Sequence, residues 1–237
     1  MNSLKVRASI PWVTLVLIAA AGSLVLHRPL HGAEAAAAIP PPVIDNPLGA
    51  GPLQSAVLAG GCFWGVQAVF EHVHGVRKVV AGYAGGDRSS AEYDTVSTGA
   101  TGHAESVRIT FDPAQITYGQ LLNIAFSVVH DPTQLNRQGP DSGTQYRSAI
   151  FYADETQKHI AEAYIAQLDR AHAFPRAIAT RLEPLRGFYP AEGYHQDYLI
   201  RHLTQYYIVV NDLPKIENLR RLFPQLYEDQ PVLYGAR

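Results

Sequence analysis

The chain has 237 residues, of which 47% are hydrophobic and 17% are charged, and its formal net charge is −2 at pH 7. This balance excludes an intrinsically disordered protein and supplies enough apolar residues for one sizeable core. No basic cluster of the kind that binds nucleic acid is present, so no nucleic-acid partner is expected.

The N-terminal segment, residues 1–35, has the pattern of a targeting sequence. Two basic residues precede an uncharged stretch at residues 8–26, and an Ala-Glu-Ala sequence follows at residues 33–35. An uncleaved membrane anchor is the alternative, but the apolar stretch is interrupted by Pro11 and a bilayer span needs about 20 apolar residues. We therefore expect an exported protein, which is either periplasmic or anchored in the membrane and facing the periplasm.

Residues 36–55 are rich in proline, glycine and alanine and show no apolar periodicity. Such a composition predicts a linker without a face that could pack. We expect a single catalytic domain at residues 56–205, followed by a C-terminal extension at residues 206–237 that docks on the core.

A strand, a tight turn and a helix are predicted at the start of the catalytic domain. Residues 55–61 form a short apolar run that ends in two glycines, and apolar residues then recur at helical spacing as far as Val73. Cys62 therefore lies at the start of the predicted helix.

The rest of the catalytic domain is predicted to contain both strands and helices. Alternation of apolar and polar residues predicts strands, whereas apolar residues at steps of three and four predict helices that pack by one face. This order favours an α+β fold with helices against a mixed sheet. The predicted strands are residues 76–83, 106–111, 148–152 and 177–185, and the predicted helices are residues 118–129, 155–173 and 214–223.

Cys62 is the only cysteine of the chain and stands in the sequence Gly-Gly-Cys-Phe-Trp-Gly. It cannot form an internal disulfide, even in an oxidising compartment. The unpaired N–H groups and the dipole at a helix N-terminus favour negative charge, so we expect a lowered thiol pKa and a nucleophilic cysteine. The alternative is that Cys62 is a small buried hydrophobic residue.

Five sequence blocks, in order and at similar spacing, resemble those of the peptide methionine sulfoxide reductase A family. Together they cover roughly residues 56–200. The resemblance implies reduction of methionine-S-sulfoxide, free or in proteins, and hence repair of oxidised proteins. It also implies a two-layer α+β sandwich, which we expect to be a ferredoxin-like plait. The blocks are Gly-Cys-Phe-Trp-Gly at 61–65, Gly-Tyr-Ala-Gly-Gly at 82–86, Thr-Gly-His-Ala-Glu at 101–105, His-Asp-Pro at 130–132 and Asp-Ser-Gly-Thr-Gln-Tyr-Arg-Ser at 141–148.

The resemblance implies a set of catalytic residues at the matched positions. Cys62 would be the nucleophile and Glu105 the acid. Tyr83 and Tyr146 would hold the sulfoxide oxygen through their hydroxyls, and Asp141 would belong to the same polar network. Without the resemblance, Glu105 would more often be an exposed carboxylate, each tyrosine would more often be a half-buried packing residue, and Asp141 could be a turn or cap residue.

The resemblance also implies a pocket for the methionine side chain. Phe63 and Trp64 would form the apolar wall that receives the methyl group, although both are equally typical of core residues. His195 lies in a block that resembles a family loop near the pocket. His103 and His130 are expected to hold turns through hydrogen bonds, and no metal site is predicted.

Reduction of a sulfoxide by a thiolate needs an acid, because attack on the sulfur must expel oxygen and bare oxide is a poor leaving group. A carboxyl buried among apolar groups has a raised pKa, so Glu105 is expected to be neutral near pH 7 and to donate that proton. A tyrosine, with a pKa of about 10, stays protonated and donates a hydrogen bond.

The oxygen that leaves methionine is expected to end on Cys62 as a sulfenic acid. Many family members then use a second cysteine near a glycine-rich C-terminus, but residues 206–237 contain no cysteine. We therefore expect an external thiol reductant, which is a thioredoxin-like or glutaredoxin-like protein or a small-molecule dithiol, and no other cofactor.

Two other functions use the same residues. A cysteine hydrolase would pair Cys62 with one of the ten histidines and an aspartate, but no histidine stands in the context of a catalytic base. A non-catalytic module would bind oxidised methionine without turnover. Consumption of a reductant during sulfoxide reduction separates the enzyme from the binding module.

Overall fold

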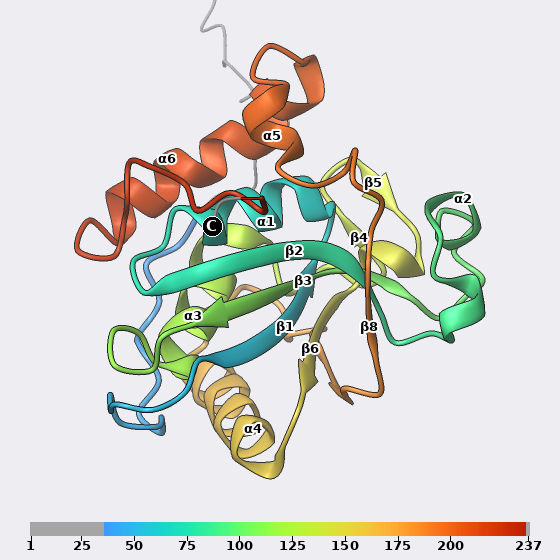
Figure 1. The fold of residues 1–237 in the computed structure, drawn as a ribbon. Helices are drawn as coiled ribbons and strands as arrows, with labels where there is room; N and C mark the ends of the chain where they lie inside the picture. The colour runs from blue at the N-terminus through green and yellow to red at the C-terminus, as the bar shows by residue number, and fades with distance from the viewer. Residues whose placement is uncertain (1–35, 236–237) are drawn as a thin grey trace, which may run out of the picture. The chain divides into compact units, whose positions relative to one another are not determined.

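Strand β1 (Gln54–Gly60) lies inside a six-stranded sheet and is hydrogen-bonded on both sides (Figure 1). The computed structural model describes residues 36–235, so the predicted targeting segment lies outside the described residues. The strand order is β7-β6-β1-β3-β2-β8, and all neighbours are antiparallel except β6 and β7. The other strands are β2 (Val76–Ala84), β3 (Ala104–Phe111), β6 (Ser148–Tyr152), β7 (Arg181–Pro184) and β8 (Phe188–Pro190).

Three of the helices supply most of the helical side chains in the buried apolar cluster that also includes one face of the sheet. Leu58 of β1 belongs to this cluster, whereas its neighbours Val57 and Ala59 belong to a second cluster, because successive side chains of a strand point to opposite faces. The three helices are α1 (Phe63–Glu71), α3 (Tyr118–Ile124), which continues as the π-helical turn η2 (Ala125–Val129), and α4 (Glu155–Arg170).

The predicted mixed sheet with helices in a single domain is confirmed. The predicted elements correspond to β1, β2, β3, β6, α1, α3, α4 and α6 (Leu213–Leu222). The predicted strand at 177–185 is correct only for β7. Its first residues lie outside the sheet, where the Ala179 N–H donates to the carbonyl of Pro132 at 2.7 Å.

Several short elements were not predicted, because segments of at most five residues give little periodicity. Two of them, β4 and β5, pair as a separate two-stranded sheet. These elements are η1 (Arg88–Ser90), α2 (Tyr93–Val96), β4 (Arg137–Gln138), β5 (Asp141–Ser142), η3 (Thr144–Tyr146), β8, α5 (Tyr198–Arg201) and the π-helical turn η4 (Ile208–Asp212).

Residues 36–53 contain no helix or strand but are bonded to the helices of the domain. The Asp45 carboxylate accepts a hydrogen bond from the Gly119 N–H at the start of α3, at 2.9 Å. The Pro40 carbonyl accepts one from the Tyr164 hydroxyl of α4, also at 2.9 Å. This segment is therefore attached to α3 and α4 before the chain enters the sheet.

The C-terminal part of the chain lies along α1. Helix α6 contacts α1, and beyond it the N–H groups of Glu228 and Val232 donate to the carbonyls of His72 and Glu71 at 2.8 and 2.9 Å. Within residues 36–235, no helix has the length and apolar character that a membrane crossing requires.

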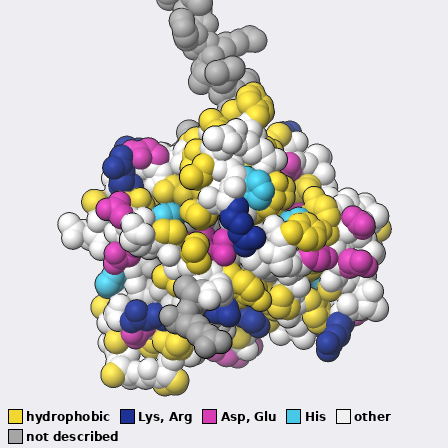
Figure 2. All heavy atoms as spheres, turned by 45° about the horizontal axis from the view of Figure 1, so that its top comes forward, with side chains coloured by type: hydrophobic (Ala, Val, Ile, Leu, Met, Phe, Trp, Pro, Cys, Tyr) yellow, Lys and Arg dark blue, Asp and Glu magenta, His cyan; other side chains and the backbone are white. Residues whose placement is uncertain are grey.

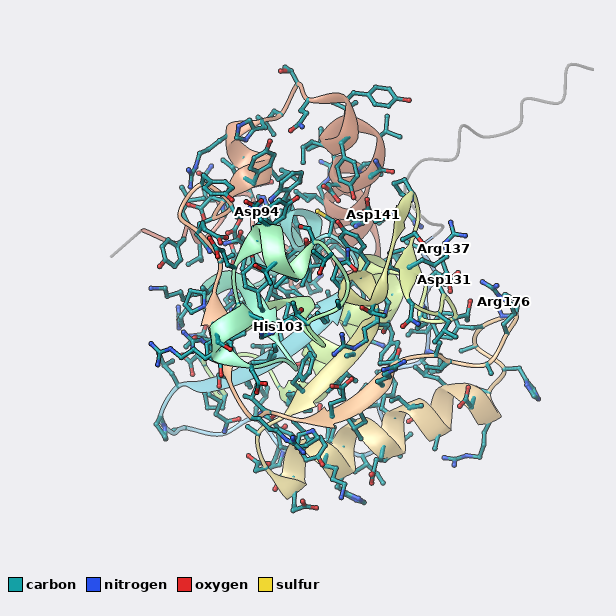
Figure 3. All side chains as sticks on the ribbon, turned by 90° about the vertical axis from the view of Figure 1, so that its right-hand side faces the viewer. Asp94, His103, Asp131, Arg137, Asp141 and Arg176 are labelled. Atoms are coloured by element: carbon teal, nitrogen blue, oxygen red, sulfur yellow. The ribbon has the colours of Figure 1, made fainter. Side chains whose placement is uncertain are left out.

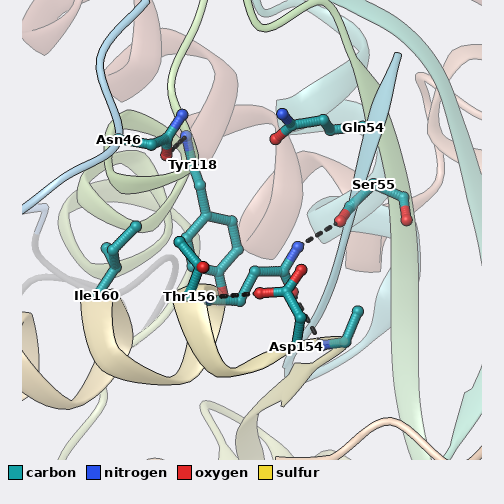
Figure 4. Close-up of a pocket in the computed structure, with 9 residues that line it drawn as sticks. Asn46, Gln54, Ser55, Tyr118, Asp154, Thr156 and Ile160 are labelled. Atoms are coloured by element: carbon teal, nitrogen blue, oxygen red, sulfur yellow. Dashed lines mark hydrogen bonds between the residues drawn. The ribbon is translucent and has the colours of Figure 1, made fainter. Parts of the chain in front are cut away.

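A cavity of about 390 Å³ lies beside the first residues of β1 (Figure 4). Gln54 and Ser55 of β1, Tyr118 of α3 and Asp154 at the start of α4 contribute to its lining. Cys62 follows the opposite end of β1, so this cavity is separate from the candidate active site.

Candidate active site

The thiol lies where β1 ends and α1 begins. Gly61 joins the two elements with a φ of +91°, and a β-carbon there would lie 2.7 Å from the Cβ of Gln138, so glycine is required. Cys62 is the N-cap of α1 and keeps 8% of its surface exposed. A sulfur atom is thus held at a helix N-terminus, almost closed to solvent.

The predicted lowering of the thiol pKa is wrong for the substrate-free protein. Burial raises the pKa of Cys62 well above its usual value, and the nearby carboxyls of Glu105 and Asp212 add to this effect. A hydrogen bond from the Trp64 N–H at the start of α1 lowers the pKa, but by less. The thiol is therefore protonated at neutral pH.

Glu105 and Tyr83 are neighbours across two strands. They are paired residues in the register of β3 and β2, so their side chains lie on the same face of the sheet. The Glu105 Oε2 accepts a hydrogen bond from the Phe63 N–H at 3.0 Å. The carboxyl therefore lies at the first turn of α1, beside the residue that follows Cys62.

The environment of Glu105 keeps its carboxyl protonated. Burial raises its pKa to about 8, and the hydrogen bond from the Phe63 N–H opposes this only in part. Most of these carboxyls are neutral at pH 7, as the sequence analysis expected for a buried acid. A group with this pKa can donate a proton in the neutral range.

The two tyrosine hydroxyls have different partners. Tyr83 donates its hydroxyl proton to Glu192 at 2.9 Å. The Tyr146 hydroxyl, on η3, makes no hydrogen bond to the described part of the chain, and burial together with the charge of Glu105 raises its pKa. Tyr146 therefore has its proton available, whereas the proton of Tyr83 is already engaged.

Asp141 lies on β5, beside the C-terminal helices (Figure 3). Its carboxylate accepts the hydroxyl proton of Tyr207. The Tyr207 ring meets Trp64 edge-on, with centroids 6.0 Å apart. Burial raises the pKa of Asp141, whereas Tyr207 and Lys215 lower it. The C-terminal extension thus reaches the site through Tyr207, a residue that the sequence analysis did not select.

Aromatic rings surround the imidazole of His195. The rings of Phe63 and Tyr93 lie 5.0 and 4.4 Å from it, and the Trp64 Nε1 donates to its Nδ1 at 3.1 Å. Trp64 is also stacked on Tyr198, with centroids 3.8 Å apart. The residues predicted to bind substrate therefore form one aromatic wall.

Two other histidines bond to nearby backbone and hydroxyl groups. The His103 Nδ1 accepts a hydrogen bond from the Gly86 N–H at 3.2 Å. The ring of His130 lies 2.7 Å from the Ser148 hydroxyl, and burial lowers its pKa to about 4. In the part of the chain that the structure describes, no group of three or more His, Cys, Asp or Glu residues could hold a metal ion.

Two acidic residues near the site were missed by the sequence analysis. Glu192 accepts the Tyr83 hydroxyl. Asp212 is fully buried, forms an ion pair with Lys215 at 3.2 Å, and lies so close to Gly65 that a β-carbon there has no room. The sequence contained only indirect signals for these two residues. Glu192 lies three residues before His195, and Asp212 lies just after an apolar run.

All the predicted site residues meet in one region around the start of α1. A thiol, a neutral carboxyl and a phenol can together reduce a group whose oxygen needs a proton as it leaves. A hydrolase is disfavoured, because the groups that shift the Cys62 pKa are carboxyls and a backbone N–H rather than a histidine. The residues are Cys62, Phe63, Trp64, Tyr83, Glu105, Asp141, Tyr146 and His195.

Comparison with known proteins agrees with this chemistry. The model of a family described as peptide methionine sulfoxide reductase matches residues 54–226. The chain is 62% identical to the peptide methionine sulfoxide reductase MsrA 2 of Mesorhizobium japonicum over 180 residues, 76% of this chain and 92% of that protein. Identity to MsrA 2 of Synechocystis sp. is 53% over 195 residues, 81% of this chain and 89% of that protein.

Two solved structures have a similar fold. Mxr1 from Saccharomyces cerevisiae in reduced form is 33% identical, with a TM-score of 0.58, over 67% of this chain and 91% of that chain. Methionine sulfoxide reductase A of Corynebacterium diphtheriae is also 33% identical, with a TM-score of 0.56, over 74% of this chain and 91% of that chain.

Proposed function

The chain belongs to the peptide methionine sulfoxide reductase family and is a peptide-methionine (S)-S-oxide reductase, and we propose that its reaction runs through a sulfenic acid on Cys62. The observation that carries this proposal is the hydrogen bond from the Phe63 N–H to the neutral, buried carboxyl of Glu105. This bond places the Glu105 carboxyl, the proposed acid, next to Phe63, the residue that follows the proposed nucleophile Cys62. Reduction of methionine sulfoxide in proteins is a repair reaction.

The oxygen transfer balances with Cys62 and the substrate alone. The S–O bond of the sulfoxide breaks and a new S–O bond forms on the Cys62 sulfur, so methionine is reduced and the cysteine is oxidised by two electrons. Glu105 donates its proton to the oxygen as the first bond weakens, and it recovers a proton from the thiol. The products are methionine and a sulfenic acid.

The remaining predicted residues position the substrate in this proposal. Phe63 and Trp64 receive the methyl group, and the His195 ring lies beside both of their rings. The Tyr146 hydroxyl binds the sulfoxide oxygen, whereas Tyr83, whose proton goes to Glu192 in this structure, would have to give up that bond to do the same. Asp141 has a separate part, because its carboxylate fixes Tyr207 of the C-terminal extension against the aromatic wall.

The sulfenic acid must be reset by thiols from outside the chain, because the sequence holds no second cysteine. A first thiol attacks the Cys62 sulfur, releases water and leaves a mixed disulfide. A second thiol then attacks the partner sulfur and frees Cys62. We propose a thioredoxin-like protein, a glutaredoxin-like protein or a small-molecule dithiol as the reductant.

The first test is stoichiometric. Without reductant, one equivalent of protein is expected to form about one equivalent of methionine and to retain one oxygen on Cys62, because no internal thiol removes it. Mass spectrometry of the protein, with dimedone as a trap, measures the oxygen, and chromatography measures the methionine.

Protein treated with the unoxidised peptide is the control for this experiment. It is handled in the same way, but the peptide carries no oxygen that could be transferred to Cys62. The steady-state rate should rise with the concentration of added thiol. An unmodified thiol after methionine has formed would show that oxygen leaves by another path, and the sulfenic acid proposal would be wrong.

A second expected result concerns the two epimers of the sulfoxide. The S epimer is reduced, and the R epimer should remain, because a pocket that fixes the methyl group at Phe63 and Trp64 and the oxygen at Glu105 accepts one configuration at sulfur. Chiral chromatography of a racemic peptide sulfoxide measures both. Equal consumption of the epimers would contradict this pocket.

Oxidised proteins are the proposed macromolecular substrates. Figure 2 shows hydrophobic side chains, interrupted by histidines and charged groups, on the face that carries α5 and α6. Tyr194, Leu203, Tyr206 and Val209 are exposed in this part of the chain. These side chains support contact with unfolded polypeptide around an oxidised methionine, since such segments expose apolar groups.

Two finer features belong to the same proposal. The order β6-β1-β3-β2, with α1 between β1 and β2 and α3 between β3 and β6, supports a ferredoxin-like plait in two layers within the catalytic domain at 56–205. The charge pattern and the Ala-Glu-Ala sequence of residues 1–35 support export to the periplasm or a membrane anchor.

A further inference from the structure

Tyr93, the first residue of α2, lies beside the reacting groups, although the sequence analysis did not select it. Burial raises the pKa of Tyr93, and so do charges on Glu105 and on Cys62, whereas a hydrogen bond from the Ser97 hydroxyl lowers it. Because Coulomb interactions weaken with distance, these effects place the Tyr93 hydroxyl near both reacting groups. Its ring also lies 4.4 Å from the imidazole of His195. Tyr93 therefore belongs to the candidate active site.

Helix α2 has few contacts of its own that could hold Tyr93 in place. It has four residues and contributes one buried side chain, Val96. The first N–H groups of a helix have no acceptor within the helix, and the side chain of Glu92, which precedes α2, does not cap them. The far end of α2 is attached to η3, where the Gln145 side chain donates to the Ser97 carbonyl at 3.1 Å. The position of Tyr93 therefore depends on the group that accepts its N–H.

Glu192 supplies this acceptor from a distant part of the chain. Its Oε1 accepts the Tyr93 N–H and its Oε2 accepts the Tyr83 hydroxyl, each at 2.9 Å. Its backbone carbonyl accepts the His195 N–H, also at 2.9 Å. Burial alone would raise the pKa of Glu192, but the hydrogen bonds that it accepts lower the pKa overall. Both carboxylate oxygens therefore remain acceptors at neutral pH.

The attachment is rigid because both of its ends belong to the sheet. Tyr83 lies in β2 and is fully buried. Glu192 follows β8, and the Ala191 N–H just before it donates to the Ala81 carbonyl of β2 at 2.9 Å. The Gln196 side chain donates to the same carbonyl, also at 2.9 Å. Glu192 thus fixes the start of α2 relative to β2.

We propose that Glu192, itself held by Tyr83, is a positioning residue for the reductase step, which binds the Tyr93 N–H and thereby keeps the Tyr93 hydroxyl at the reacting groups. This inference rests on the proposed function only in taking Cys62 and Glu105 as those groups. Tyr83 keeps its bond to Glu192 throughout, so its single proton remains where the structure places it. Glu192 acts on the reaction through Tyr93 and does not touch the substrate.

Glu192→Ala tests this role by removing both acceptor oxygens of the side chain. The first turnover, measured by rapid quench as methionine formed with protein in excess, should slow about tenfold, the scale of one lost hydrogen bond. In a Tyr93→Phe protein the same substitution should cause no further loss, because the two residues act as one unit. General damage to the fold would instead slow both proteins alike.

Conservative variants separate positioning from charge. Glu192→Gln should stay within about twofold of the native rate, because its amide oxygen still accepts the Tyr93 N–H and its amide nitrogen can donate to the Tyr83 oxygen. Tyr83→Phe keeps the buried ring but not the hydroxyl, so the rate should fall about threefold, and only when Tyr93 has its own hydroxyl. Glu92→Ala is the matched control and should leave the rate unchanged, because Glu92 is exposed and does not cap α2.

Three results would overturn the proposal. They are a native rate in Glu192→Ala, a loss that persists in the Tyr93→Phe protein, and a rate in Glu192→Gln as low as that in Glu192→Ala. If thermal unfolding shows that Glu192→Ala does not fold, Tyr83→Phe with and without Tyr93→Phe decides the question alone. Every rate is compared with the native protein, so failure of the sulfenic acid proposal, which would appear as an unmodified Cys62 in the native protein, is a distinct result.

Discussion

The Cys62→Ser protein is expected to form no methionine above background from a peptide sulfoxide with dithiothreitol as reductant. A serine hydroxyl lacks the acidity and nucleophilicity of a thiol, and transfer of the oxygen to it would require an O–O bond. Burial and the nearby carboxyls already disfavour an anion at residue 62 even for the more acidic thiol. Chromatography of the peptide products measures the effect.

The Cys62→Ser substitution should abolish the reaction without changing folding or substrate binding. Serine is almost the same size as cysteine, so the thermal unfolding temperature and the affinity for the S-sulfoxide peptide should stay close to those of the native protein. Full activity in this variant would reject Cys62 as the nucleophile.

The Glu105→Gln protein is expected to reduce sulfoxide roughly 10²-fold more slowly or worse in a single turnover, the scale for loss of a general acid. Glutamine can still accept the Phe63 N–H through its amide oxygen, so the first turn of α1 is preserved. It cannot supply an acidic proton to the leaving oxygen. Rapid-quench measurement of methionine at saturating peptide gives the rate of this step.

The pH profile adds an independent check on Glu105. Because its pKa is raised to about 8 and the protonated form is the active one, the native rate should fall as pH rises through about 8. This fall should be absent in Glu105→Gln. Glu71→Gln is the matched control, since Glu71 is another buried carboxyl with its pKa raised to about 9. A rate within a few-fold of native in Glu105→Gln would exclude Glu105 as the acid.

The long elements of the fold could be predicted because their apolar patterns are strong. Residues 55–73 contain an apolar run, two glycines and a helical stripe, and the structure has β1, Gly61 and α1 there. The short strand β8 was missed, since its three residues acquire strand geometry only by pairing with β2. The contacts of residues 36–53 with α3 and α4 could not be predicted for a related reason. They are hydrogen bonds to residues that lie far away in the sequence.

The site could be predicted only in part. Cys62 and Glu105, its proposed acid, stand in recognisable blocks, but Tyr207 and Glu192 reach the site from the C-terminal part through contacts that no spacing reveals. The thiol pKa was misjudged for a similar reason. A helix N-terminus is visible in sequence, whereas the carboxyls that surround Cys62 come from β3, β5 and the π-helical turn η4.

The narrow exposure of Cys62 governs the order in which reactants arrive. With 8% of the residue open to solvent, the proposed cycle leaves little room at the sulfur for a methionine side chain and a reductant thiol together, so we expect peptide and reductant to exclude each other. In the proposed cycle methionine therefore leaves before a thiol arrives, which predicts double-displacement kinetics. If Cys62 carries the proposed sulfenic acid, an excess of oxidised protein would shield that sulfenic acid from thiols as well as produce it, and a high substrate concentration would slow regeneration of the thiol.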